Sequence, residues 1–150
     1  MYPDQLLKEY GNTVGLPDLA FDAGNSLVLT IGSEVEIYVQ ADPENGGLIL
    51  HTEVGQPHSP GPNLFKQLLQ ANLFHSGTGS PVTALGPSGE VIVLLGLTRA
   101  ELELENFVRA LEQLLEEAAH WRPLILDPHG EKEITENPSV MQGVNPFLMA

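Results

Sequence analysis

The feature that most constrains the fold is a short amphipathic segment, Asn63 to Phe74, which lies between two β-rich regions. Its leucines recur at helical spacing and form one apolar stripe, which predicts a helix of about three turns. Pro60 and Pro62 stop any element before it, and Asn63 is a favourable N-cap. A helix this short is marginal alone. It must dock on its own sheet or on a second copy of the chain, and periodicity leaves both open.

The region before this segment predicts a helix followed by an antiparallel meander. Pro3 and Asp4 favour a helix start, and Gly15 favours its end. Apolar and polar residues then alternate in three runs, at residues 26–31, 34–40 and 48–54. Short glycine-containing turns join these runs, which is typical of neighbouring antiparallel strands.

The region after it predicts two strands and a long helix. Residues 81–85 form a short strand, and Val91 to Leu97 form a strand that is apolar on both faces, so both should be covered. Thr98 and Glu101 make a capping box for a helix that runs to about Trp121 and that Pro123 ends.

These elements predict one α+β domain over residues 1–126, an antiparallel twisted sheet with helices in the order α-β-β-β-α-β-β-α. Residues 127–150 lack periodicity and are rich in turn formers, which predicts a flexible C-terminal tail. Its last residues are apolar and could dock on the body or on a neighbour.

The composition excludes several classes of function. Twenty acidic residues against six basic ones give a net charge of -14, which argues against nucleic acid and anionic membranes as partners. Without cysteine there is no disulfide, thiolate catalysis or cysteine-bound zinc. The chain begins with no secretory signal pattern, and its longest apolar run is too short to span a bilayer. We therefore expect a cytoplasmic protein.

No catalytic or cofactor motif is apparent. His51, Glu53 and His58 could suggest a metal site, but they straddle a strand and a proline-rich loop and imply no fourth ligand. The glycine-rich stretch at residues 76–80 lacks the lysine and spacing of a phosphate-binding loop. We expect no metal, no cofactor and no enzymatic activity. Binding, including self-association through the middle helix, is the favoured role.

Four stretches carry a resemblance to a known family: LLKEYGNTVGLPDLAFDAGNSLVLTIG, EVEIYVQADPENGGLILHTEVG, NLFKQLLQANLF and the end of the long acidic helix, AAHWRPL. In this order and spacing the chain resembles the CesT/Tir-type class I chaperones of bacterial type III secretion, over about Leu6 to Leu124. The resemblance implies a homodimeric, ATP-independent cytoplasmic chaperone. It would bind the N-terminal segment of an effector in extended form and hand it to the secretion apparatus, with the secretion ATPase or sorting components as further partners.

The resemblance also assigns residues to two surfaces. It places the dimer interface on the middle helix and the strand after it, at Leu64, Phe65, Leu68, Leu69, Asn72, Leu73, Val93 and Leu95. It places client contacts on the first helix and the sheet, at Leu6, Tyr10, Leu16, Val28, Tyr38 and Ile49. An adaptor or regulatory protein of the secretion system on the same fold, binding a folded partner, is the alternative. An enzyme with an undetected site is a third.

Overall fold

The computed structural model describes residues 1–59, 61–74 and 80–126, and the predicted tail lies outside these ranges. The described residues form an α+β fold with one five-stranded antiparallel sheet, as predicted. In chain order the elements are α1 (Pro3–Val14), β1 (Ser26–Ile31), β2 (Val35–Ala41), β3 (Leu48–Gly55), α2 (Pro62–Ala71), the 3₁₀ turn η1 (Asn72–Phe74), β4 (Val82–Leu85), β5 (Val91–Leu97), the 3₁₀ turn η2 (Arg99–Glu101) and α3 (Leu104–Leu126).

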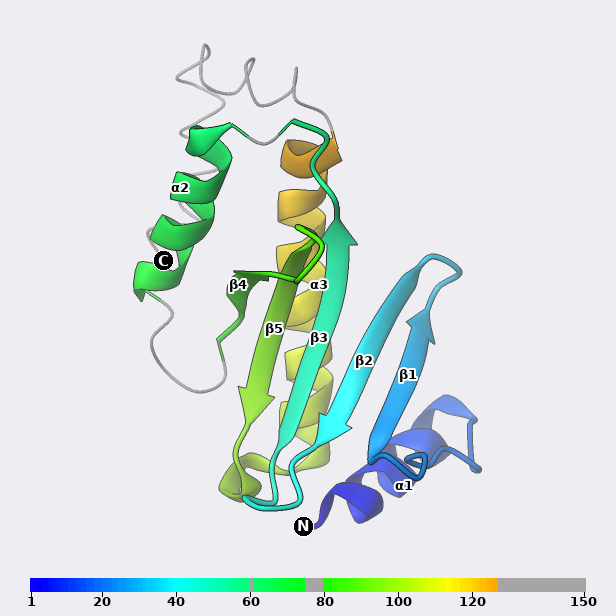
Figure 1. Ribbon diagram of the computed structural model, residues 1–150. Coiled ribbons are helices and arrows are strands. Elements are labelled where there is room, and N and C mark those ends of the chain that lie inside the picture. Colours follow the sequence, from blue (N-terminus) through cyan, green and yellow to red (C-terminus); the bar gives the residue numbers. More distant parts are fainter. Residues whose placement is uncertain (60, 75–79, 127–150) are drawn as a thin grey trace.

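The sheet has the order β1-β2-β3-β5-β4, so β5 lies in its interior and β1 and β4 form its edges. The helix α3 lies along β3 and β5 on one face of the sheet (Figure 1). Its side chains Phe107, Leu114 and Trp121 are buried there. The helix α1 joins the same core, because the Tyr10 ring meets the edge of Phe107 with 5.0 Å between centroids. Both helices therefore cover one face of the sheet.

A close approach of the backbone explains a glycine within α1. The Leu16 N–H donates to the carbonyl of Gly11 at 2.7 Å, which folds the chain back over the helix end. An ideal Cβ on Gly11 would lie 2.3 Å from the carbonyl oxygen of Leu16. Gly15 then ends the helix in the left-handed region, at φ 77°, as its position predicted.

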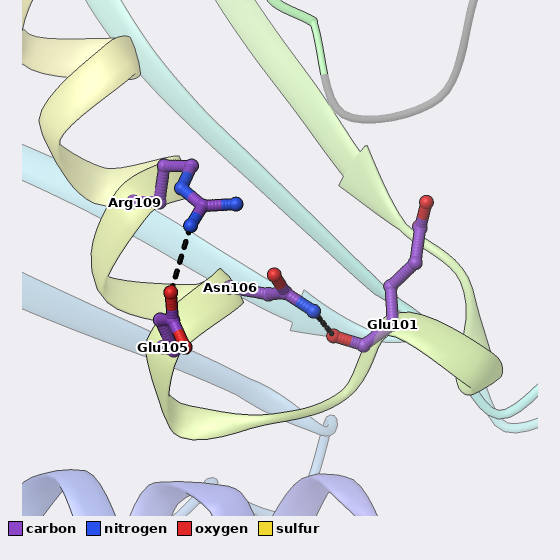
Figure 2. A network of polar contacts seen from close by, with 4 residues as sticks. All are labelled: Glu101, Glu105, Asn106 and Arg109. Atoms are coloured by element: carbon purple, nitrogen blue, oxygen red, sulfur yellow. Dashed lines mark hydrogen bonds and ion pairs between the residues drawn. The ribbon is translucent and has the colours of Figure 1, made fainter.

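The predicted capping box forms, but it encloses η2 and not the long helix. The Glu101 carboxylate accepts hydrogen bonds from the N–H and hydroxyl of Thr98 at 2.7 and 3.0 Å. The helix α3 begins only at Leu104. Asn106 ties the two together by donating to the Glu101 carbonyl at 3.0 Å, and Arg109 pairs with Glu105 at 2.9 Å on the solvent side (Figure 2).

Two predicted helix boundaries are wrong. The N-cap of α2 is Gly61 with Pro62 at the first helical position, not Asn63, because a proline is already suited to that position. Pro123 does not end α3, which continues to Leu126. The buried side chains of Leu124 and Ile125 extend the apolar stripe past the proline, and their packing offsets the lost hydrogen bond.

The expectation for β5 also needs correction within one protomer. Val91, Val93, Leu95 and Leu97 are buried against the helices, while Ile92 and Leu94 on the opposite face are only partly buried. The strand is antiparallel to both its neighbours, and such a sheet can leave one face open. Among the described elements no helix covers that second face, which we call the open face.

Candidate protein-binding surfaces

A line of apolar and aromatic side chains crosses the open face from one edge of the sheet to the other. The strand register aligns Val28, Tyr38, His51, Leu94 and Val82 on five neighbouring strands, and we call these residues the cross-sheet row. Val28 and Tyr38 are 47% and 37% exposed, and the other three are partly buried. The rings of Tyr38 and His51 stack with 5.0 Å between centroids and 9° between planes. The row is thus a shallow, pre-formed apolar strip.

The two sides of the row differ in polarity. On one side Ile49 is 41% exposed beside Gln40. On the other side a pocket of about 290 Å³ is lined by Tyr38, Glu36, Glu53 and Arg122, among others. The Tyr38 hydroxyl donates to Glu36 at 3.2 Å, and the negative charge of Glu36 raises the pKa of Tyr38. The apolar strip therefore lies beside carboxylates along one flank.

The histidines of the described residues do not form a metal site. No group of three histidine, aspartate or glutamate side chains in the described ranges could hold a metal ion. His51 instead packs on Tyr38, and its burial lowers its pKa. Burial also lowers the pKa of His120 on α3, an effect that the charge of Glu117 opposes. His51 is thus mainly neutral at neutral pH and belongs to the apolar strip.

The β1 edge of the sheet is available for main-chain pairing over a short length. Asp22 covers its start, because its carboxylate accepts from the Ser26 N–H at 2.9 Å and its N–H donates to the Ser26 carbonyl at 2.8 Å. The Ala41 N–H donates to the Asn25 carbonyl. Hydrogen-bonded and outward-facing residues alternate along an antiparallel ladder. The N–H and C=O groups of Val28 and Thr30 therefore point to the outer edge.

The β4 edge is closed by the turn that follows α2. The Asn72 amide accepts from the Thr83 N–H at 2.9 Å and donates to the Thr83 carbonyl at 3.0 Å, as a neighbouring strand would. The Thr83 hydroxyl donates to the Leu68 carbonyl at 2.8 Å. These bonds fix α2 against β4 and occupy the outward main-chain groups of Thr83. Of the two edges, β1 is the more accessible to an added strand.

The helix α2 has one face on the protein and one face in solvent. Leu64 and Leu68 are buried against the core. Leu69 and Leu73 are 73% and 70% exposed, the highest values among the large apolar side chains of the described residues, and Phe65 is partly buried. We call Leu69 of α2, together with Leu73 of the η1 turn that follows it, the α2 outer face. Two exposed leucines one helical turn apart are typical of an interaction surface.

The sequence model of the Tir chaperone protein (CesT) family matches residues 5–122 of the chain. The chain belongs to this family. The description of the family is that of a chaperone of the protein Tir. In this protein no helix of the described ranges is long and apolar enough to cross a membrane.

Individual relatives agree with the family assignment. The transcriptional anti-antiactivator ExsC of Pseudomonas aeruginosa is 26% identical over 122 residues, 81% of this chain and 84% of ExsC. The solved ExsC–ExsE complex matches with a TM-score of 0.72 and 26% identity over 83% of this chain and 97% of that one. The HopA1–SchA chaperone–effector complex matches with a TM-score of 0.69 at 23% identity, over 79% and 91% of the two chains. At that identity the likeness shows the fold alone.

The structure of this CesT-family protein separates the predicted interface residues into two groups. Leu64, Leu68, Val93 and Leu95 are buried inside the protomer, and Asn72 is bonded to β4. Leu69 and Leu73 are exposed, with Phe65 partly so. Within the predicted set, Leu69 and Leu73 are the side chains that the protomer leaves most accessible.

The residues predicted to contact a client also divide into a buried group and an exposed group. Leu6 and Tyr10 are core residues, at 0% and 8% exposure. Leu16 is 51% exposed in the segment that joins α1 to β1. Val28, Tyr38 and Ile49 come together on the open face.

The sequence analysis did not assign three contributors to the open face. Two of them are Leu94 and Val82, and the third is His51, whose ring packs on Tyr38. Alternation along each strand predicts which residues share a face. It does not predict which residues of different strands align, so the row was not apparent.

Proposed function

We propose that this CesT-family chain is a homodimeric cytoplasmic chaperone of type III secretion that binds the N-terminal segment of an effector in extended form. The observation that carries the proposal is the cross-sheet row, an apolar strip that no helix of the described ranges covers and that begins at the accessible β1 edge. The solved relatives are consistent with this role, since SchA was solved with the effector HopA1, and SpcU with ExoU. By binding the N-terminal segment of the effector, this chain would keep that segment soluble and ready for export.

The β1 edge accounts for how an unfolded segment is recognised without one fixed sequence. An added strand would form main-chain hydrogen bonds with Val28 and Thr30, which any residue except proline can provide. Its alternate side chains would lie on the open face next to Val28, at the beginning of the cross-sheet row. Main-chain bonds then supply general affinity, and the row selects apolar side chains. Asp22 limits the pairing to a few residues.

The homodimer rests on the α2 outer face. In a two-fold dimer the same patch meets itself, so Leu69 and Leu73 of each copy would be buried together with Phe65. The rigid contact of α2 with β4 through Asn72 and Thr83 holds this helix at a fixed angle. The α2 outer face therefore has a fixed position before association, which reduces the conformational entropy lost when two copies associate.

A regulatory role is the second candidate, and one observation favours it. The curated relative ExsC is an anti-antiactivator by name, and its solved complex is with ExsE. In this second candidate role the chain would bind a protein partner that belongs to transcriptional regulation and not to export. The two roles differ in the partner and not in the fold.

Co-expression with the protein encoded beside its gene, followed by limited proteolysis, tests the proposal. We expect the chain to protect an extended N-terminal segment of that protein, while protection of a folded domain would support the regulatory or adaptor role. Val28→Pro removes the outward N–H and should weaken binding by about tenfold, the value of one to two hydrogen bonds. Val28→Thr keeps that N–H and serves as the control. Equal affinity of both variants would refute strand addition at β1.

A further inference from the structure

The sequence that follows α3 has an apolar, uncharged end. The chain carries a net charge of -14, yet no residue from Asn137 to Ala150 has a charged side chain. Within that stretch, residues 144–149 read VNPFLM and hold four large apolar side chains. An apolar segment of this kind gains free energy by leaving water. It also escapes the repulsion that an acidic segment would meet at an acidic surface.

The end of α3 lies at the rim of the open face. An ideal Cβ on Gly55, the last residue of β3, would lie 3.0 Å from the Leu126 side chain. Arg122, one turn earlier in α3, lines the same pocket as Tyr38, Glu36 and Glu53 of the open face. The chain therefore leaves α3 beside the last residue of β3, at the rim of the open face.

The length of this segment is ample for a return to the row. Val144 follows Leu126 by 18 residues, which span up to about 60 Å when extended. His51, in the middle of the row, lies four residues along β3 from Gly55, or about 13 Å. The apolar end is therefore held at a high effective concentration near the row, since the root-mean-square end-to-end distance of an unfolded 18-residue chain, about 20–25 Å, is of the same order as the span it must cover.

We propose that residues 144–149 bind the cross-sheet row of their own chain when no partner occupies it. The open face would then be covered by an internal apolar segment, and a client would displace that segment on binding. The row's role as a client site comes from the proposed function, whereas its coverage by residues 144–149 can be tested without any client.

Disulfide trapping in the full chain tests this directly, because the chain has no cysteine of its own. The test pair is Val28→Cys with Leu148→Cys. The control pair is Glu112→Cys with Leu148→Cys, where Glu112 is exposed on the solvent side of α3. With oxidised glutathione as the oxidant, we expect the test pair to form an intramolecular disulfide at least about tenfold faster than the control, since docking raises the local thiol concentration. A same-chain product runs at protomer mass on a non-reducing gel, and the loss of free thiols, measured by maleimide labelling, distinguishes it from unreacted chain.

Adding Phe147→Asp to the test pair should reduce its rate to that of the control pair. Equal rates for the test and control pairs would overturn the proposal. A rate that Phe147→Asp leaves unchanged would overturn the apolar mechanism, and product at twice the protomer mass would overturn the same-chain assignment. None of these outcomes involves a client, so they leave the Val28→Pro experiment on the proposed function independent.

Discussion

Leu69→Asp distinguishes a self-association surface on α2 from an ordinary exposed helix. Leu69 is 73% exposed in the protomer, so nearly three quarters of its side chain remains available for burial. Full burial of a leucine contributes about 1.5–3 kcal/mol. Two-fold symmetry uses the residue twice, so the pair should contribute about 2–4 kcal/mol to dimerisation. Its loss raises the dissociation constant by about 30-fold to 1,000-fold, before the cost of desolvating two carboxylates.

Light scattering coupled to size-exclusion chromatography measures this effect. The wild type should have twice the 16.2 kDa protomer mass, and Leu69→Asp should have the protomer mass over a range of micromolar concentrations. Val14→Asp is the matched control, because Val14 is 47% exposed at the end of α1, far from α2 in Figure 1, and gains the same charge. The buried Trp121, the sole tryptophan, reports by fluorescence that each variant is folded.

A variant that stays dimeric at every concentration at which the wild type is dimeric would refute the role of α2. A wild type that is monomeric at micromolar concentration would refute the dimer itself. If Val14→Asp also dissociates, the effect arises from charge and not from the lost apolar contact.

Three further predictions concern the fold and the open face. Thr83→Val removes a hydroxyl that is bonded to the Leu68 carbonyl and should lower the free energy of unfolding by about 1–2 kcal/mol in urea titrations, whereas Thr30→Val on the exposed face of β1 should change it little. Burial lowers the pKa of His51 below its usual 6.5, so the unfolded chain binds the proton more readily. The free energy of unfolding should therefore fall as the pH drops below about 6.5, less steeply in His51→Gln, and an unchanged slope would contradict the burial of His51. Gly11→Ala should lower the free energy of unfolding by about 1–3 kcal/mol, because the added Cβ meets the carbonyl oxygen of Leu16. The loss should be measured as a lower midpoint temperature of thermal unfolding. Gly24→Ala should have a small effect, and a similar loss in both variants would rule out the steric reason.

Much of the fold could be predicted because its information is local. Alternation in β1 to β3 predicted which side chains face the core, and turn formers predicted where each strand ends. The errors occurred where packing outweighed a local preference. Pro123 lies inside α3, because the buried residues after it extend the helix. The capping box at Thr98 encloses a 3₁₀ turn, since α3 begins only at Leu104.

The candidate surfaces were less predictable from periodicity. Leu68 and Leu69 are adjacent leucines in one helix, and only the contact with β4 decides that Leu68 is buried and Leu69 is exposed. The family resemblance assigned Asn72 to the dimer interface, but in the structure its side-chain amide is hydrogen-bonded to Thr83 and closes the β4 edge. Leu6 and Tyr10 lie on an apolar helix face that serves the core and not the surface.

The sequence by itself determined the class of fold, the order of the elements and the family, because hydrophobic period, turn chemistry and motif spacing are properties of neighbouring residues. Only the tertiary structure decided which apolar residues are accessible. The alignment of Val28, Tyr38, His51, Leu94 and Val82 depends on strand register. That register joins residues far apart in the chain, while the packing of α3 along β3 and β5 covers the other face of the sheet. The same packing leaves β1 as the accessible edge and the α2 outer face in solvent, and these surfaces carry the proposed binding of a client and of a second copy.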